Sequence, residues 1–495
     1  MLYKSTRNKE ITVTASEAIL KGLSEDGGLF VPVEIPKLDV PMEQLKEMTY
    51  QEIAYEVMRR FFSDFTEEEL RDCIDKAYDE KFDIEEISSL VKADGNYYLE
   101  LFHGATIAFK DMALSILPHL LLTAAKKNQS KEEIVILTAT SGDTGKAALA
   151  GFADVEGTRI IVFYPKHGVS KVQELQMVTQ KGENTAVVAI HGNFDDAQSG
   201  VKAIFEDKAL AEELREHGFC FSSANSINIG RLVPQIVYYV YAYAKLLQNE
   251  EIKDGEEINV TVPTGNFGNI LAAYYAKNMG VPIGKLICAS NENKVLYDFF
   301  TTGTYDKNRE FILTASPSMD ILVSSNLERL VYLITGQDSD KTKDLMKALQ
   351  SQGVYEIDEN MKRGLTDFSS GYATEEAAMK MIRDLYENTG YVIDPHTAVA
   401  ASVCHDYAKK SRDSRKNLIV STASPYKFIK SVMTAIEGEV YREKEEFSMV
   451  EELRKLSGME VPKAVRELFG APIRHTLECD VDKMEDTVKQ VLKIV

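Results

Sequence analysis

The sequence is short of positive charge. Of its 495 residues, 57 are Lys or Arg and 77 are Asp or Glu, which gives a formal net charge of −20 at pH 7. Nucleic acids and anionic membrane surfaces attract proteins through basic patches. The composition therefore argues against a protein that binds either of them. It leaves room for an anionic small molecule, because a single pocket can be positive in an acidic protein.

Cysteine and long apolar runs are also scarce. The five cysteines are far apart in the chain: Cys73, Cys220, Cys288, Cys404 and Cys479. An odd, scattered set predicts reduced, buried thiols, not a disulfide framework or a zinc site. No apolar run reaches the roughly eighteen residues of a membrane span, and the first fourteen residues lack the apolar core of a signal peptide. We see no internal repeat and no low-complexity tract, and we expect a cytoplasmic protein without a membrane partner.

The chain does contain a recurring succession of strand, short polar loop and helix. Continuous apolar, β-branched runs are typical of buried parallel strands. These runs are Ile134–Thr138, Ile160–Tyr164, Ala186–Ile190, Ile258–Val262, Lys285–Ala289 and Leu418–Val420. Between the last two, Ser316–Ile334 has the pattern of a helix. The order predicts an α/β fold with open, mostly parallel sheets covered by helices, whose ligands bind at the carboxyl ends of the strands.

Pattern and composition divide the chain into four expected regions. Residues 1–100 have the mixed helix and turn patterns of an N-terminal α+β region. We assign residues 101–135 and 215–440 to a large α/β domain and residues 136–214 to a small α/β domain. Residues 441–495 are highly charged and mostly helical in pattern, so we expect them to form a C-terminal cap.

One lysine has unusual surroundings. In Leu101–Leu114 (LFHGATIAFKDMAL), Lys110 follows three apolar residues and precedes a helical run. Burial disfavours the charged form of an amine and lowers its pKa, and such a lysine can form a Schiff base with an aldehyde. For a lysine taken alone, the commoner explanation is a helix start whose ammonium reaches solvent. His103 is a candidate proton carrier, although single histidines are more often packed or surface groups.

The loop Thr264–Asn269 (TGNFGN) is the clearest candidate anion site. Its two glycines, Gly265 and Gly268, allow the backbone to approach a ligand closely. The loop ends at the start of a predicted helix, where free N–H groups and the helix dipole favour a phosphate. A tight strand-to-helix turn without any ligand would explain the same residues.

A second loop of this type is Thr140–Gly145 (TSGDTG). A lysine follows it, as in a nucleotide-binding P-loop, but a threonine stands where the leading glycine belongs, and Ala147 replaces the hydroxyl residue that would hold magnesium. ATP is therefore a poor fit. The hydroxyls of Ser141 and Thr144, with backbone N–H groups nearby, suit a carboxylate.

Two further polar stretches follow strands or precede helices. Ser223–Arg231 (SANSINIGR) precedes an apolar helix, and Arg231 with its amide and hydroxyl neighbours could bind a second phosphate. An N-cap cluster whose arginine pairs with a surface acid is the commoner explanation. Thr422 ends the last strand and fits either a site hydroxyl or a helix N-cap. Asp394-Pro395-His396 has no further ligand at metal spacing, so we predict no metal.

Taken together, these motifs resemble the threonine synthase family, which are pyridoxal-phosphate enzymes of the tryptophan-synthase-β-like type (fold type II). The motifs that carry the resemblance are, in order, STRN, GLSEDGGLFVP, ELFHGATIAFKD, LTATSGDTG, YPKHGVSKVQELQM, NSINIGRL, VPTGNFGN, DPHTA and STASPYKF. The first two are typical of the longer microbial and fungal members. The resemblance covers nearly the whole chain, and motifs in a shared order are far more specific than any one of them.

The resemblance implies a cofactor, a reaction and a set of site residues. The cofactor is pyridoxal 5'-phosphate, and the reaction eliminates phosphate from O-phospho-L-homoserine and adds water to give L-threonine. Lys110 is implied as the catalytic lysine, which also binds the cofactor. The other implied cofactor ligands are Gly265, Asn266, Phe267, Gly268, Asn269 and Thr422. The implied substrate ligands are Ser141, Asp143, Thr144, Ser226, Asn228, Arg231 and Lys166, with Ser170 as a further candidate.

One implied ligand departs from the pattern of the wider fold family, which often has asparagine in place of Asp143. An aspartate beside the phenolate oxygen of the cofactor would repel it unless the two share a proton. The resemblance implies that this subfamily uses aspartate at this position, and the family assignment rests on all the motifs together.

Two rival functions remain open at this point. Another pyridoxal-phosphate lyase of the same fold, such as a serine or threonine dehydratase, would have no use for a second phosphate site. A non-catalytic binding or regulatory protein on the same scaffold would not need an intact Lys110 and both glycine loops. We expect a small-molecule substrate and no nucleic acid, and the sequence does not decide between a monomer and a homodimer.

Overall fold

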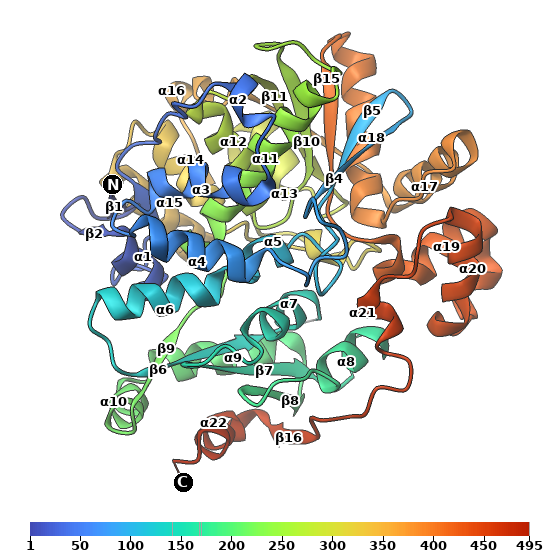
Figure 1. Cartoon of the computed structure of the whole chain (residues 1–495). Coiled ribbons are helices and arrows are strands. Elements are labelled where there is room, and N and C mark those ends of the chain that lie inside the picture. The colour runs from blue at the N-terminus through green and yellow to red at the C-terminus, as the bar shows by residue number, and fades with distance from the viewer. Residues whose placement is uncertain (141, 168, 170, 495) are drawn as a thin grey trace.

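Two largely parallel sheets position the rest of the chain. The computed structural model describes residues 1–140, 142–167, 169 and 171–494, without the side chain of Lys171. In Figure 1 the larger sheet lies above and the smaller sheet below. The larger sheet has the strand order β14 (Phe368–Tyr372), β11 (Ile283–Ser290), β10 (Ile258–Pro263), β15 (Lys416–Ser421), β5 (Asn96–Glu100) and β4 (Ser89–Ala93). Only β4 in this sheet runs antiparallel to its neighbour.

The smaller sheet is parallel throughout. Its strand order is β16 (Leu477–Asp480), β8 (Thr185–His191), β7 (Thr158–Pro165), β6 (Glu133–Ala139) and β9 (Phe219–Ser222). All six strands predicted from the apolar runs are present in one sheet or the other. The predicted α/β architecture with two open, mostly parallel sheets is therefore confirmed. Strand β16 was not expected, because the charged sequence of the C-terminal region has no apolar run.

Helices cover both sheets. Those of the N-terminal part are α1 (Ala15–Lys21), α2 (Met42–Leu45), α3 (Tyr50–Phe61) and α4 (Glu67–Ala77), and they accompany a small antiparallel sheet of β1 (Leu2–Ser5), β2 (Thr12–Thr14) and β3 (Phe30–Pro32). Those near the smaller sheet are α7 (Asp143–Phe152), α8 (Lys171–Val178), α9 (Phe194–Glu206), α10 (Lys208–Glu216) and α22 (Met484–Leu492).

The larger sheet has the longer set of helices. They are α5 (Asp111–Leu114), α6 (Leu117–Lys127), α11 (Ile229–Gln248), α12 (Gly268–Met279), α13 (Val295–Thr302), α14 (Leu327–Ile334), α15 (Ser339–Gln352), α16 (Glu359–Arg363), α17 (Glu375–Thr389), α18 (Pro395–Ser411) and α19 (Ile429–Glu437). A two-stranded ribbon of β12 (Thr304–Asp306) and β13 (Val354–Glu356) lies among them, and α20 (Val450–Ser457) and α21 (Lys463–Arg466) follow. Within the described residues, no helix combines the length and apolarity needed to cross a membrane.

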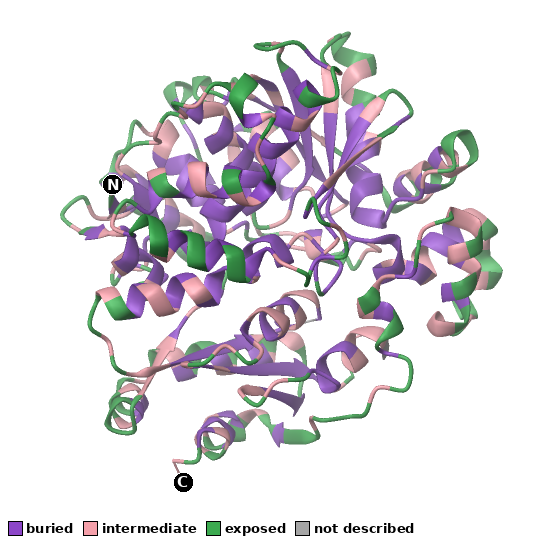
Figure 2. Ribbon diagram, in the orientation of Figure 1, coloured by how far each residue is buried: buried purple, intermediate pink, exposed green. Residues whose placement is uncertain are grey.

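Helix α11 is the centre of the core. It is buried along nearly its whole length and packs against α3 and α12. Figure 2 shows the burial of the central helices and of both sheets, with exposed residues on the outer helices. The apolar sequence of this helix predicts that position, because a helix that is apolar on most faces must be surrounded by other elements.

The prediction of a helix over Ser316–Ile334 is wrong in its first half. A short 3-10 turn, Pro317–Met319, and an irregular segment precede α14 there.

The limits of the four expected regions stay predictions. Strands β4 and β5 lie before residue 100 yet pair into the larger sheet, and β9 lies after residue 215 yet pairs into the smaller one.

The N-terminal region is fastened to the larger sheet through one buried acid. Glu328, on α14, accepts hydrogen bonds from the Thr6 hydroxyl at 2.6 Å and from Nε and Nη2 of Arg7 at 2.8 and 2.7 Å. Glu328 is only 5% exposed. Because a carboxylate can accept from a guanidinium fork and a hydroxyl together, it anchors the STRN motif to a helix more than three hundred positions later in the chain.

We predict that Glu328→Gln lowers the free energy of unfolding by about 2 kcal/mol, measured by urea denaturation. Breaking a fully buried pair costs about 3–5 kcal/mol, and Arg7 is partly exposed, which reduces the loss. Glu10→Gln, at an exposed position of the same region, is the control. A loss no larger than that of the control would show that this anchor adds nothing to stability.

Candidate active site

Three segments that are far apart in sequence meet at the carboxyl edge of the larger sheet. Strands β5, β10 and β15 are parallel neighbours, so the chain leaves all three at one edge. The backbone N–H of Phe109 donates to the Thr422 carbonyl at 2.8 Å, and that of Ser424 donates to the Ile107 carbonyl at 3.0 Å. The sheet thereby brings Lys110 beside Thr422, as its topology requires.

The amine of Lys110 is buried. The residue is 9% exposed, and its Nζ donates to the Ser318 hydroxyl at 3.1 Å and lies 3.9 Å from Oδ2 of Asp143. Burial lowers the pKa of Lys110, and the nearby charges of Lys427 and Arg231 act in the same direction, while Asp143 opposes them. The neutral amine, which is the nucleophilic form, is therefore more accessible here than in an ordinary lysine.

Asp143 follows β6 of the smaller sheet, and its carboxylate faces the amine of Lys110. It is the first residue of α7, whose Gly151 approaches α5 so closely that a Cβ there would lie 2.2 Å from the Leu114 carbonyl oxygen. Burial alone would raise the pKa of the Asp143 carboxyl. The positive charges of Lys427 and Lys110 outweigh that effect and hold the pKa well below its usual range.

The loop Thr264–Asn269 has the shape of an anion cradle. Phe267 has a φ of 65°, a left-handed conformation that turns the chain into the N-terminus of α12. A Cβ on Gly265 would lie 2.4 Å from the Ser318 carbonyl oxygen, so only glycine fits. Asn269 accepts hydrogen bonds from Tyr238 and Tyr239, while its Nδ2 is buried with no hydrogen-bond partner among the described residues. The loop therefore combines a helix N-terminus with an unused donor.

The stretch Ser223–Arg231 divides into a structural and a candidate binding part. Asn228 caps α11 by accepting from the Gly230 N–H at 2.8 Å, and its Nδ2 donates to the Ile19 carbonyl, so the N-cap explanation holds for this residue. No acidic side chain among the described residues forms an ion pair with Arg231. This arginine is 4% exposed, donates from Nη1 to the Ala224 carbonyl at 3.0 Å, and has a buried Nε without a hydrogen-bond partner in the described chain. Burial lowers its pKa to about 10.

Asn326 connects these two polar loops. Its Nδ2 lies 3.1 Å from the Asn266 carbonyl oxygen and 3.2 Å from the Ser226 carbonyl oxygen, and its backbone N–H also donates to Asn266 at 3.1 Å. Arg329, which is fully buried, holds the Asn326 side-chain oxygen and donates from Nε to the Phe30 carbonyl at 2.9 Å. One amide therefore fixes the spacing of both loops and ties them to the N-terminal region.

Several of these residues were missed by sequence reasoning. Ser318 and Asn326 lie in the segment that the pattern assigned to a helix, so nothing suggested that they turn toward the site. Lys427 and His396 lie within STASPYKF and DPHTA, which we noted as motifs without giving these two residues a role. His396 is hydrogen-bonded to Asp394 (Nδ1 to Oδ2, 2.7 Å) and accepts the Ser318 N–H at 3.1 Å through Nε2.

Some of the other predicted site residues make contacts away from Lys110, and two lie outside the residues that the structure describes. Lys166, at the end of β7, forms an ion pair with Glu478 of β16. His103 contacts Ser89 and Glu100 through its Nε2. Ser141 and Ser170 lie outside the described residues. The binding roles given to Thr144, Thr422, Lys166 and the remaining candidates stay predictions.

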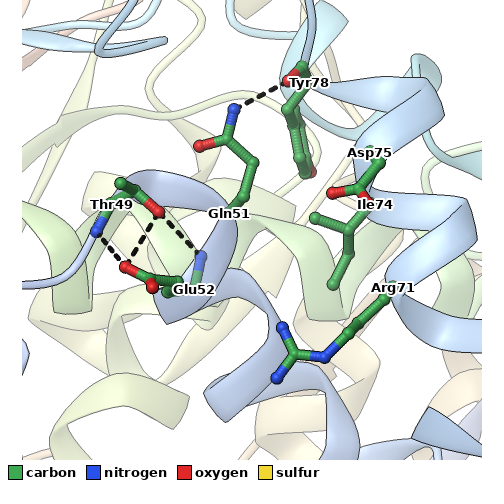
Figure 3. Close-up of a pocket in the computed structure, with 7 residues that line it drawn as sticks. All are labelled: Thr49, Gln51, Glu52, Arg71, Ile74, Asp75 and Tyr78. Atoms are coloured by element: carbon green, nitrogen blue, oxygen red, sulfur yellow. Dashed lines mark hydrogen bonds between the residues drawn. The ribbon is translucent and has the colours of Figure 1, made fainter. Parts of the chain in front are cut away.

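A separate cavity lies on the surface of the N-terminal region. It has a volume of about 360 Å³ and lies between α3 and α4 (Figure 3). Its lining residues are Thr49, Gln51, Glu52, Arg71, Ile74, Asp75 and Tyr78. Thr49 and Glu52 cap α3 through each other, Gln51 donates to the Tyr78 carbonyl at 2.8 Å, and Arg71 pairs with Glu67. These groups are engaged in holding the helices, so the cavity does not compete with the Lys110 site.

Three family models match successive parts of the chain. Residues 2–78 match "Threonine synthase N terminus", residues 81–424 match "Pyridoxal-phosphate dependent enzyme", and residues 397–488 match "Threonine synthase, C-terminal". The middle model covers well over half of the chain and contains Lys110, the loop Thr264–Asn269 and Thr422.

Individual proteins give the same family. The chain is 34% identical to threonine synthase of Saccharomyces cerevisiae over 98% of this chain and 99% of that protein. It is 41% identical to threonine synthase-like 1 of Pongo abelii over 85% of this chain, but it spans only 58% of the length of that longer relative. The crystal structure of pyridoxal-phosphate-bound threonine synthase from Brucella melitensis superposes with a TM-score of 0.88, at 32% identity and full coverage of both chains.

We predict that Asn326→Ala loosens both polar loops at once. Amide hydrogen exchange should rise about tenfold or more in residues 223–228 and 264–269, because a lost buried hydrogen bond of about 1.5 kcal/mol raises the opened fraction by about that factor. Ser325→Ala is the matched control, since the Ser325 hydroxyl makes only a long, exposed contact with Asn266. Faster exchange in only one loop would contradict the bridging role.

Proposed function

Because the chain belongs to the threonine synthase family of pyridoxal-phosphate-dependent enzymes, we propose that it converts O-phospho-L-homoserine and water to L-threonine and inorganic phosphate. The observation that carries the proposal is the pairing of a buried lysine with two separate anion sites. Lys110 lies at the carboxyl edge of the larger sheet, and the loop Thr264–Asn269 and Arg231 each offer a buried nitrogen that lacks a partner in the described chain. A reaction with a phosphorylated cofactor and a phosphorylated substrate needs two such sites.

The residues at the site fit pyridoxal 5'-phosphate. The N-terminus of α12 and Nδ2 of Asn269 suit its phosphate. Lys110 supplies the amine for its aldehyde, and the neutral hydroxyl of Thr422 suits its pyridine nitrogen. When bound, the cofactor supplies a conjugated ring that takes up the negative charge developed at the substrate Cα.

The side chains at the site then transfer protons, bind the substrate phosphate and position the reacting amine. The Lys110 amine, whose pKa is lowered by burial, removes the Cα proton of the substrate and returns protons later in the cycle. Arg231 binds the γ-phosphate and stabilises it as it leaves, using the Nε that has no hydrogen-bond partner in the described chain. Ser318 and Asp143 hold the amine in position: its Nζ donates to the Ser318 hydroxyl and lies 3.9 Å from Oδ2 of Asp143. Water then adds at Cβ to give L-threonine.

The rival functions are less well supported. A serine or threonine dehydratase of the same fold has no phosphorylated substrate, and it would have no use for the buried Nε of Arg231 that lacks a hydrogen-bond partner in the described chain. A non-catalytic protein would not require the buried Lys110 beside a carboxylate. The proposal also includes a cytoplasmic location, a monomer or homodimer, and a small-molecule substrate without nucleic acid, in keeping with the net charge of −20.

We predict that Lys110→Ala abolishes the absorbance band near roughly 410 nm of the cofactor-loaded protein. Production of threonine and phosphate from O-phospho-L-homoserine should fall by about 10³-fold or more, since both the covalent attachment and the proton transfer depend on this amine. Both products are assayed, and the wild-type protein should release them in equal amounts. Turnover retained by the variant would rule out the assignment of Lys110. A wild-type band without any response to this substrate would favour the dehydratase.

We predict that Arg231→Lys raises the KM for O-phospho-L-homoserine by about 10- to 100-fold, because charge-assisted hydrogen bonds contribute about 1.5–3 kcal/mol. The cofactor affinity, measured by absorbance titration of the cofactor-free protein, should change by less than about threefold. Arg215→Lys, at an exposed position on α10, is the control. Equal weakening of cofactor and substrate would mean that Arg231 is structural.

A further inference from the structure

Lys427 is a second buried amine at the site, and the reaction as described gives it no task. It lies in the turn that follows β15, and its side chain is 1% exposed. Its Nζ donates to the Thr106 carbonyl at 2.9 Å and lies 3.5 Å from Oδ1 of Asp143. Thr106 is held in turn by Asp111, whose carboxylate accepts from the Thr106 N–H at 2.8 Å and from its hydroxyl at 2.6 Å. The ammonium is therefore clamped to the loop that carries Lys110.

The two oxygens of Asp143 face different cations. Oδ1 is near Nζ of Lys427 and accepts from Gln173 at 3.2 Å. Oδ2 is 3.9 Å from Nζ of Lys110 and accepts from the Ser318 hydroxyl at 3.1 Å. The Ser318 hydroxyl also accepts from Lys110. The carboxylate thus lies between a lysine that reacts and a lysine that does not.

The charge of Lys110 does not stay constant beside the Asp143 carboxylate. Under the proposed function its amine becomes bonded to the cofactor and later carries protons, so its charge changes during each turnover. A buried carboxylate without a compensating cation is strongly disfavoured, and breaking a buried pair costs about 3–5 kcal/mol. If Lys110 were the sole cation near Asp143, the carboxylate would lose its partner in the middle of the reaction.

We propose that Lys427 is a positioning residue whose ammonium neutralises Asp143 throughout the cycle and so keeps Asp143 and Ser318 in place while Lys110 changes its charge. The proposal rests on the proposed function. It also explains why an aspartate is tolerated where the wider fold family often has asparagine. The Asp143–Lys427 pair has the same net charge as one neutral amide, so it presents no excess negative charge to an anionic ring oxygen.

The surrounding charges do not replace Lys427 in this role. The charges of Arg231 and Asp111 also affect the pKa of Lys110, and that of His396 affects the pKa of Asp143. The charge of Lys427 in turn affects the pKa of Lys146. Of these, His396 is engaged with Asp394 through Nδ1 and with the Ser318 N–H through Nε2. Lys146 contacts Gln180, and Arg231 is directed at the Ala224 carbonyl.

The test is a double-mutant cycle on the cofactor-loaded protein with Lys427→Met, Asp143→Asn and the double variant. Lys427→Met leaves Asp143 uncompensated beside the nitrogen of Lys110. It should lower kcat about 100-fold and move the midpoint of the pH titration of the cofactor absorbance upward by about one unit, since an unpaired negative charge favours the protonated nitrogen. The double variant should regain about tenfold or more in kcat and return the midpoint to within about 0.3 units of wild type, because asparagine needs no cation.

Two further variants keep the test decisive. Lys427→Arg retains the charge and should keep the wild-type midpoint, whereas Lys430→Met on α19 is the control for loss of a nearby lysine and should change neither readout. If Lys427→Met fails to fold while the double variant folds, the same charge pairing is supported. A double variant no better than Lys427→Met in both readouts, or a Lys427→Arg variant shifted like Lys427→Met, would overturn the proposal and leave Lys427 as an anchor for Thr106. Lack of threonine production by the wild-type protein would instead overturn the proposed function.

Discussion

The buried carboxylate of Asp143 between two lysines is the interaction on which the arrangement of the site depends. Asp143 begins α7, the helix that follows β6 of the smaller sheet, and Lys110 and Lys427 belong to segments that follow strands of the larger one. Because a carboxylate and two amines can be buried only together, the two sheets must approach each other at this point. The same contacts hold Ser318 against the glycine loop. The same contacts of Asp143 therefore determine both the electrostatic surroundings of the Lys110 amine and the relative position of the two sheets.

A second set of contacts keeps the polar loops at a constant separation. Asn326 joins the carbonyls of Asn266 and Ser226, and Arg329 joins Asn326 to β3. Glu328, between them in sequence, holds Arg7 and Thr6. The N-terminal region, whose helices and strands contain no candidate catalytic group, therefore contributes to the site indirectly, by fixing the segment that spaces the two anion loops. This gives the STRN motif a physical role that its composition did not reveal.

The sequence predicted the elements of the fold better than it predicted the surroundings of the site. Apolar β-branched runs predicted six strands, because burial on both faces of a sheet leaves a continuous apolar signal. The segment Leu232–Leu247, apolar on most faces, predicted the central helix. The segment that contains Ser318 and Asn326 misled the pattern analysis. Its spacing is compatible with a helix, yet the Asp320 carboxylate accepts hydrogen bonds from the Thr314 N–H and from Nδ2 of Asn291, which stabilise an irregular turn instead. Local hydrogen bonds of this kind leave no periodic pattern in the sequence, so the sequence did not predict the turn.

The sequence by itself determined the α/β class, the order of strands and loops, and the motifs that place the chain in its family. These follow from local composition and from the obligation of each apolar run to be buried. Only the tertiary structure decided which polar groups face one another. Lys427 is more than three hundred positions from Lys110 in the chain, and Asn326 is about a hundred from Ser226. Such pairings depend on sheet register and on the packing of α7 against α5. The sequence shows that a charged residue must be neutralised if it is buried, but it does not show which distant residue neutralises it.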